Sequence, residues 1–476
     1  MAGAASLAED IIAMRLKVKT VKRYKTNVGD FVGYLQTNHA ESSCYVAATD
    51  DAPHDVNLAN VSPEEYKDFF GDKIIKRDRN GNDIGYMSFE HVSGFKSAIV
   101  DLHKKRRVEM PTECKATLSE FFAGYKRKIA DLKQNGDLST TEGKAAMTFP
   151  GYKFVAKEAA SAERDFRSSM FAWTFLILAW NLMARSVSVS GIMFDHIQWV
   201  NDSLTIVFPK HKGDQDGSNA APKHVYANPS NPTICPVLAL AVWVFCIGMR
   251  REGTSRLLFG DVEKAENKFS KWLHAMCGDC VADLLLMGLI ILDIGSHSFR
   301  KGIATFLSGI PGGPTAIAIY LRAGWSLGPV TSRYILEGGG GDELCGRAAT
   351  GNSMNDYTFA DLPPHFASGT PLTTAEWEDI LPGYSTWYPQ KFRQVLPFLF
   401  ASLIYHRAWI EATFPREHPI FSMRVWTSGL MGRKAGSVLS GCMQNGDSGL
   451  VATGVPPHLV LANKIEQVRK ACTVSV

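Results

Sequence analysis

Six residues in the middle of the chain carry the groups needed to cleave a phosphodiester. In chain order they are Arg185, Lys212, His297, Arg300, Trp325 and Tyr334. A phosphodiester repels nucleophiles, and its pentacoordinate transition state gathers more negative charge on the non-bridging oxygens. Planar guanidinium groups are suitable counter-charges for those oxygens. We therefore predict a phosphate clamp of two arginines that acts together with a tyrosine nucleophile.

The arginines of the predicted clamp are Arg185 and Arg300, and each donor of this kind typically contributes a factor of ~10²–10³ to the rate. Lys212 is predicted to protonate the leaving 5′ oxygen, because a mobile ammonium can release a proton and a guanidinium cannot. Lys210 is the alternative acid. Tyr334 would attack in line and become a 3′-phosphotyrosine, which conserves the energy of the broken bond for rejoining. This chemistry needs no cofactor, ATP or metal ion.

His297 and Trp325 are predicted to assist at the phosphate. A free phenol has a pKa of about 10 and must lose its proton during attack. His297 would therefore either accept that proton or donate a hydrogen bond to the phosphate. The indole N–H of Trp325 can donate one hydrogen bond while the ring packs against its neighbours.

The segments around the first two residues predict how they are held. Arg185 ends the apolar stretch MFAWTFLILAWNLMAR, whose pattern predicts a helix and thus a rigid support. Lys212 lies in a polar, glycine-containing connection between two β-like runs. We expect a small antiparallel sheet over 195–227, with this lysine at or near a hairpin turn.

The remaining residues are predicted to lie on helices. His297 and Arg300 are three residues apart in a helical pattern that Ser296 opens as a cap, and this spacing puts both side chains on one face. Trp325 follows a glycine at the end of another helical pattern, and Tyr334 lies nine residues later on a second short helix.

In this order and spacing the residues resemble those of the tyrosine recombinases, the lambda-integrase-type family that includes phage integrases and eukaryotic Crypton transposons. The family pattern is Arg, Lys, His-x-x-Arg, His or Trp, and Tyr. The matching strings are LMARSVSVSGI, FPKHKGDQ, HSFRKG, AGWS and SRYI. EGK at 142–144, PKHKGDQ, and FADLPPHF at 359–366 are similar to segments of Crypton elements. Ser188 departs from the pattern, because many members have an acidic residue at that position.

The resemblance implies a site-specific DNA recombinase or transposase that acts on double-stranded DNA as a dimer or tetramer, in a eukaryotic nucleus. It implies a mainly α fold with a small antiparallel sheet (α+β). We expect a helical core-binding domain at 1–135, a linker at 136–158, a catalytic domain at 159–345 and a helical C-terminal extension at 346–476. The extension would either dock on a neighbouring subunit or on DNA, or form a small helical domain of its own.

Two other functions would use the same residues. A type IB topoisomerase-like enzyme would relax supercoils as a monomer, and a domesticated DNA-binding protein would have lost strand cleavage. We expect neither a membrane nor a small-molecule substrate as a partner in any of the three cases.

Two basic runs in the N-terminal part are candidate DNA contacts. Together with a lysine near the predicted hairpin, they supply Lys104, Lys105, Arg106, Arg107, Lys126, Arg127 and Lys210. The formal net charge is only +4, so affinity for DNA has to come from local patches of this kind. Acidic residues are interspersed, and a solvated helix face is therefore the alternative.

The nine cysteines form no even framework and no signal peptide is recognisable, so we expect a reducing, intracellular compartment. CGDC at 277–280, with His274 nearby, is half of a zinc pattern, although a single CxxC is more often structural. The uncharged span Ser168–Ala184 is shorter than the ~20 residues of a membrane helix. This span and the apolar run at 281–292 are predicted to be buried core helices.

Overall fold

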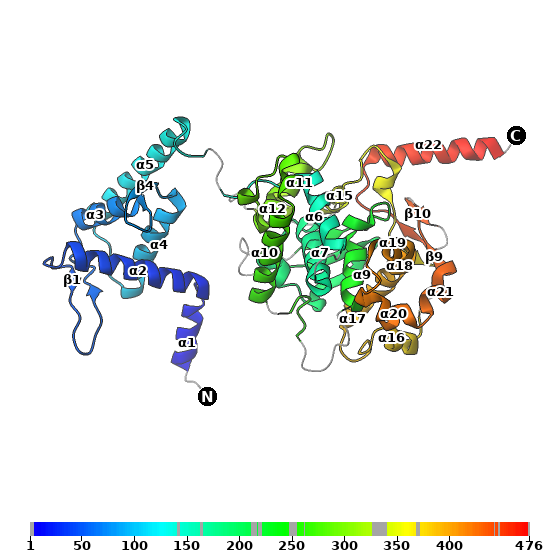
Figure 1. The fold of residues 1–476 in the computed structure, drawn as a ribbon, viewed down its shortest axis with the longest axis horizontal. Coiled ribbons are helices and arrows are strands. Elements are labelled where there is room, and N and C mark those ends of the chain that lie inside the picture. Colours follow the sequence, from blue (N-terminus) through cyan, green and yellow to red (C-terminus); the bar gives the residue numbers. More distant parts are fainter. Residues whose placement is uncertain are drawn as a thin grey trace. The chain divides into compact units, whose positions relative to one another are not determined.

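The computed structural model describes residues 4–139, 143–161, 165–210, 217, 221–246, 255–260, 262–325, 340–367, 372–441, 443–445 and 448–474. The chain divides into two compact units, residues 1–142 (unit 1) and 143–476 (unit 2), each with its own hydrophobic core (Figure 1). The fold is mainly helical with small antiparallel sheets, in agreement with the α+β prediction. Within the described residues, every helix is too short or too polar to span a bilayer.

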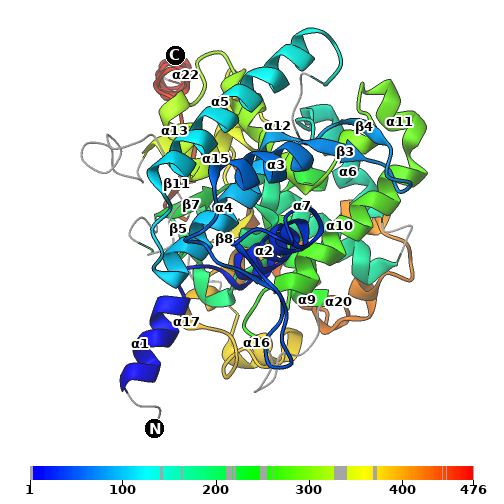
Figure 2. The same cartoon turned by 90° about the vertical axis from the view of Figure 1, so that its left-hand side faces the viewer.

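Unit 1 consists of helices with two short antiparallel hairpins (Figure 2). Its elements are α1 (Ala4–Ala13), α2 (Val18–Asn38), β1 (Tyr45–Val46), β2 (Asp55–Val56), α3 (Pro63–Lys73), β3 (Ile75–Arg77), β4 (Asp83–Tyr86), α4 (Phe89–Arg106) and α5 (Thr112–Gln134). Ser62 caps α3, and it forms a capping box in which the Glu65 carboxylate accepts a hydrogen bond from the Ser62 backbone N–H. Phe31, Phe69 and Phe70 meet edge to face in the core.

The first part of unit 2 contains the segments singled out above. Its elements are α6 (Phe149–Ser161), α7 (Phe166–Asn181), α8 (Ser186–Ser190), β5 (Ile197–Val200), β6 (Ser203–Val207), β7 (Pro222–Val225), α9 (Pro236–Cys246), α10 (Val262–Asp279), α11 (Val281–Leu286), α12 (Ser296–Ser308) and α13 (Ala316–Ala323). The strands form an antiparallel sheet in the order β5-β6-β7, as the sequence predicted. The hairpin between β6 and β7 is the one expected to carry Lys212.

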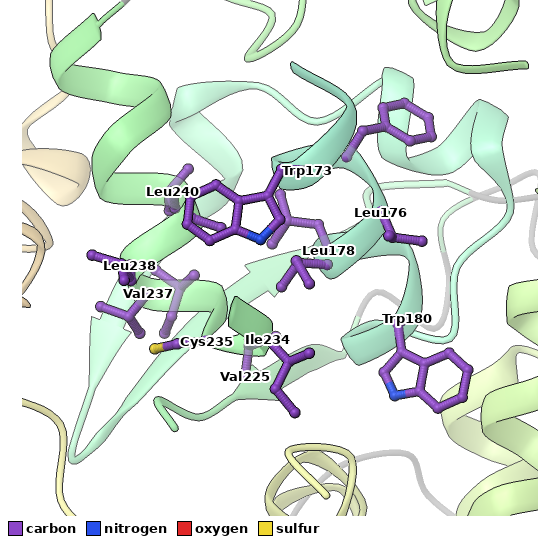
Figure 3. Close-up of a cluster of buried hydrophobic side chains, with 14 of the residues drawn as sticks. Trp173, Leu176, Leu178, Trp180, Val225, Ile234, Cys235, Val237, Leu238 and Leu240 are labelled. Carbon is purple, nitrogen blue, oxygen red and sulfur yellow. The ribbon is translucent and has the colours of Figure 1, made fainter. Parts of the chain in front are cut away.

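Helix α7 lies at the centre of the core of unit 2 (Figure 3). The prediction of a buried helix at Ser168–Ala184 is confirmed, because nearly every residue of α7 is buried. Trp173 and Trp180 are enclosed, and the Trp173 indole N–H donates to the Thr233 carbonyl at 2.7 Å. Helix α9 contacts α7 and adds Leu238 and Leu240 to the cluster. This rigid centre supports the chain that leaves the C-terminal end of α7.

Two stretches differ from their predicted form. Helix α6 begins at Phe149, inside the range expected to be a linker, because its apolar face is buried in the core. The run at 281–292 is not a buried helix: α11 ends at Leu286, and a turn at Gly288 with a φ of 73° follows. Leu284 and Leu289 are buried, whereas Leu286 is 88% exposed. The glycine turn breaks the periodicity that one buried face would require.

The chain after the predicted tyrosine completes unit 2. Its elements are α15 (Gly340–Ala348), β8 (His365–Phe366), α16 (Thr374–Ile380), α17 (Gln390–Arg393), α18 (Leu396–Tyr405), α19 (Arg407–Thr413), α20 (Arg424–Thr427), α21 (Leu430–Lys434), β9 (Val438–Leu439), β10 (Gln444–Asn445), β11 (Leu450–Val451) and α22 (Pro457–Val474). Residues 346–476 thus lie in the same compact unit as 143–345. The buried Arg347 guanidinium pairs with Asp202, in the turn between β5 and β6, and donates to the Thr453 carbonyl.

Candidate active site

A small pocket in unit 2 collects several of the predicted residues. Its described lining residues come from the turn after α7, the sheet, α12 and the end of α13, and they are Leu182, Met183, Ala184, Arg185, Ser188, Phe208, Lys223, Arg300, Arg322, Ala323 and Gly324. Four of these are basic and none of them is acidic; Arg322 is paired with Asp342, so Arg185, Lys223 and Arg300 supply the positive charge. A pocket of this composition attracts an anion.

The turn between α7 and α8 positions Arg185. Helix α7 ends at Asn181, and Met183 then adopts a left-handed conformation with a φ of 48°, which is uncommon for a residue other than glycine. Arg185 precedes the first residue of α8 with an extended backbone. Among the described residues, no hydrogen bond or ion pair involves its guanidinium. With respect to the described part of the chain, its five N–H donors are available to a ligand.

Arg300 joins two turns at the pocket. It lies on α12, is 7% exposed, and donates from Nη1 to the Met183 carbonyl at 2.7 Å. Its Nη2 donates to the carbonyl of Ala323, at the end of α13. The guanidinium carbon lies 5.6 Å from the centre of the Trp325 ring. Arg300 therefore holds the turn that carries Arg185 beside the turn that carries Trp325.

The two arginines repel each other. Burial lowers the pKa of Arg300 to about 10, and the positive charge of Arg185 adds to this effect. Burial also lowers the pKa of Arg185. Both groups stay protonated at neutral pH. Ser188 lines the same pocket, at the position where the family pattern described above often has an acidic residue. The described lining therefore supplies no carboxylate that would balance the two arginines. A bound anion would remove this imbalance.

Trp325 and His297, the other predicted residues on described segments, are not among the described lining residues of the pocket. Trp325 is half-buried, packs edge to face on Tyr320, and has no hydrogen bond from its indole N–H to any described residue. His297 lies in the first turn of α12 and is exposed. The cap of this helix also differs from the prediction, because Ser298 rather than Ser296 accepts a hydrogen bond from the backbone N–H of Gly295.

Two of the six predicted residues, a lysine and the tyrosine, are on segments that are not described. Lys212 and Tyr334 lie outside the described residues. Lys210 is described, and it is exposed at the end of the β6 side of the hairpin, outside the described lining of the pocket. Lys223 lines the pocket instead: it lies on β7, and its ammonium donates to the Arg322 carbonyl.

Lys223 was not predicted as a site residue, although the sequence around it contains one indication of such a role. Lys223 is the second residue of β7, and the three residues that follow it, His224, Val225 and Tyr226, are buried. A lysine that enters such a run needs a specific partner or role, because lysines are rarely buried without one. The sequence pattern instead favours a lysine in the turn, where its side chain would be mobile.

Arg322 was also missed, and it has a structural role at the edge of the pocket. Its side chain is fully buried, pairs with Asp342 of α15, and donates to the carbonyls of Asn181 and His224 at 2.7 Å each. Burial opposes the charge of Asp342, but Arg322 and hydrogen bonds from His224 outweigh it and hold the pKa of that carboxyl well below its usual range. This network ties α15, downstream of the predicted tyrosine, to α13 and β7.

The predicted DNA contacts of unit 1 lie on its surface. Lys104, Lys105, Arg106, Arg107, Lys126 and Arg127 are all exposed. Arg106 is engaged within the unit, because its guanidinium pairs with Asp55 at 2.6 Å and donates to the Val56 carbonyl. Lys104 and Arg107 line a hollow beside His103. These residues can reach a partner, and their role as DNA contacts stays a prediction.

The CxxC segment has no metal-site geometry in the described part of the chain. Cys277 is buried and Cys280 half-buried, and neither forms a disulfide within the described residues. No group of three histidine, cysteine or acidic residues that could hold an ion occurs among the described residues.

Comparison with known proteins adds no relative to these observations. No protein-family model matches the chain, and no curated protein matches it significantly.

Proposed function

We propose that this protein cleaves and rejoins DNA strands through a covalent 3′-phosphotyrosine, as a site-specific recombinase or transposase. The observation that carries the proposal is the pair of mutually repelling guanidiniums, the half-buried Arg185 and the buried Arg300, at one pocket with no acidic side chain among its described lining residues. Such a pair is unfavourable without an anion, so its presence at a pocket favours a phosphate ligand.

In the proposed reaction the scissile phosphate binds between the two guanidiniums. Arg185 offers all its donors to the non-bridging oxygens, while Arg300 keeps N–H groups for the phosphate beyond the two that bind carbonyls. The Tyr334 oxygen attacks phosphorus, the bond to the 5′ oxygen breaks, and that oxygen takes up a proton. The negative charge that accumulates on the non-bridging oxygens is the charge that the clamp stabilises.

The proton for the 5′ oxygen would come from a lysine. Lys212 is the residue predicted from the sequence pattern, with Lys210 as its alternative. Lys223 is the lysine that lines the pocket, and its carbonyl partner holds the ammonium beside the two arginines. The indole N–H of Trp325 would donate to a phosphate oxygen. His297 would reach the phosphate or the tyrosine from the start of α12.

Trapping the covalent intermediate tests the proposal. Because the target sequence is unknown, the substrate is a pool of randomised duplexes, each nicked a few nucleotides beyond the cleavage position so that the released 5′-hydroxyl fragment diffuses away. The expected result is a denaturant-stable adduct whose DNA is esterified to Tyr334, identified by mass spectrometry of the attached peptide. Tyr334→Phe should form no adduct and should bind duplex DNA as the wild type does, because one hydroxyl contributes little to phosphate-dominated binding. An adduct on another residue, or none from the whole pool, would contradict the proposal.

The partners that we propose for the protein follow from this reaction. The substrate would be double-stranded DNA, bound by a dimer or tetramer of the chain, in a nucleus. Incubation with supercoiled plasmid distinguishes the topoisomerase alternative, since relaxation without recombinant products would favour a monomeric type IB enzyme.

A further inference from the structure

A second basic hollow lies on unit 2, at residues that the predicted active site does not use. It is formed by the first part of α10 and the start of α7, and its described lining residues are Ser168, Lys264, Asn267, Lys268, Lys271 and Trp272. Three of the six are lysines, and none is acidic. This stretch was not among the basic runs recognised in the sequence.

The three lysines follow one face of α10. Lys264, Lys268 and Lys271 are spaced by four and then three residues, which places them on neighbouring turns of the same side. The first and last are separated by about 10 Å along the axis at ~1.5 Å per residue. A strand of duplex DNA carries a phosphate every ~3.4 Å of its axis, so the row is long enough for about three phosphates.

The described lining of the hollow is positively charged and holds one buried donor without a described partner. Burial lowers the pKa of Lys268, and Arg167 contributes in the same direction, whereas Asp165 opposes the effect. The Lys268 ammonium also lies 4.8 Å from the centre of the Phe171 ring. Trp272 is 7% exposed, and its indole N–H has no hydrogen-bond partner in the described structure. The site therefore offers positive charge and a spare donor to an anionic ligand.

The position of α10 relates this hollow to the candidate active site. Helix α10 contacts α7, α8 and α12, the elements that carry or adjoin Arg185 and Arg300 (Figure 1). All of them belong to the same compact unit, so the arrangement is fixed by one core. The hollow lies at the start of α7 and Arg185 follows the end of that helix, so an anion that contacts both would extend over about 24 Å, the length of α7 at ~1.5 Å per residue.

We propose that the α10 hollow binds the phosphate backbone of double-stranded DNA on one side of the cleaved position. The inference rests on the proposed function for the identity of the ligand. The phosphates at the hollow are contacted without sequence readout, since lysine ammoniums recognise charge and not base edges. The contact adds affinity and fixes the direction in which the duplex leaves the arginine pocket.

The test is the salt dependence of DNA binding by the full-length protein. The variant carries Lys264→Ala, Lys268→Ala and Lys271→Ala together, and the probe is the pool of randomised duplexes. Loss of three phosphate contacts should reduce the slope of log K against log salt by about 2.7, because each contact contributes ~0.9. At 0.15 M salt this corresponds to a loss of affinity on the order of a hundredfold.

A matched variant controls for the change in net charge. Lys391→Ala, Arg416→Ala and Arg433→Ala remove the same three charges from exposed positions elsewhere on unit 2. The slope of log K against log salt for this control should differ from the wild-type slope by less than ~0.9, which is the contribution of one phosphate contact. Thermal unfolding checks that both triple variants fold, which is expected because all six side chains are exposed.

The outcomes separate this inference from the proposed function. Equal slopes for the two triple variants would overturn the α10 contact, even if the wild type forms the phosphotyrosine. At low salt and saturating protein, the α10 variant should still form that adduct, because its arginine pocket is intact. In another outcome, the wild type binds duplex DNA and the α10 variant shows the predicted loss of affinity, but the wild type forms no adduct. That outcome would support the DNA-binding surface and refute strand cleavage. A wild type that binds no duplex would overturn both.

Discussion

Replacing Arg185 by alanine should reduce activity and leave stability unchanged, whereas replacing Arg300 should reduce both. In the described structure Arg185 makes no hydrogen bond and repels Arg300. Arg185→Ala should therefore leave the free energy of unfolding unchanged to within about 0.5 kcal/mol, or raise it. Arg300 donates to the carbonyls of Met183 and Ala323, and a hydrogen bond from a charged donor is worth about 1.5–3 kcal/mol. Arg300→Ala should thus lower the free energy of unfolding by at least about 3 kcal/mol.

Urea unfolding measures the stability difference, and two further assays measure function. Adduct formation on the nicked pool should fall by about 10²–10³ in Arg185→Ala. Inorganic phosphate at ten times its Kd should stabilise the wild type by about 1.4 kcal/mol, and this gain should disappear in Arg185→Ala. Arg416→Ala, at an exposed position remote in sequence, is the control and should keep both properties. If Arg185→Ala lost several kcal/mol of stability and kept its response to phosphate, the guanidinium would be a structural group and the clamp would not exist.

Three further predictions concern the acid, the pH dependence and the C-terminal part. Lys223→Ala should cleave ordinary DNA slowly but regain activity on a duplex with sulfur at the 5′ bridging position, because a thiolate leaves without a proton; slow cleavage of both substrates would exclude Lys223 as the acid. His406 and His418 are buried, and burial lowers the pKa of each to about 4. The unfolded chain takes up these protons near pH 6.5, so it binds more protons between pH 4 and 6.5 and stability should fall as the pH drops through that window, by up to about 3 kcal/mol per histidine. Urea unfolding of His406→Gln as a function of pH should show a shallower fall than the wild type, and an identical pH profile would contradict the assignment. Arg347→Met should lower the free energy of unfolding by about 3–5 kcal/mol, because it leaves the Asp202 carboxylate buried and unpaired; a change below 1 kcal/mol would mean that the carboxyl is protonated in the folded protein.

The sequence predicted the parts of the fold that depend on local pattern. The buried helix α7 and the antiparallel sheet each follow from the pattern of apolar and polar residues in one segment. The apolar run at 281–292 was predicted wrongly, because composition favours burial while the turn at Gly288 prevents a single buried face. Periodicity describes a segment and does not say how much of it the rest of the chain can cover.

The candidate site was predictable in its residue types and not in its geometry. The pairing of Arg185 with Arg300 at one pocket was expected from the motif order, and both residues line it. The binding of Arg300 to two carbonyls was not foreseeable, since it depends on where two turns far apart in the sequence meet. Lys223 was not predicted for a similar reason. Its place at the pocket depends on the register of β7 against β6.

The buried pair between Arg347 and Asp202 has a consequence for any shortened form of the protein. A chain ending soon after residue 345 would lack the guanidinium, and Asp202 would keep an isolated charge in the turn that joins β5 to β6. It would also cut α15 short, so the helix that packs on β7 would lose its last residues. Expression trials that trim the C-terminal region should therefore yield aggregates instead of a folded fragment, and fragments for crystallisation are better cut at the junction near residue 142.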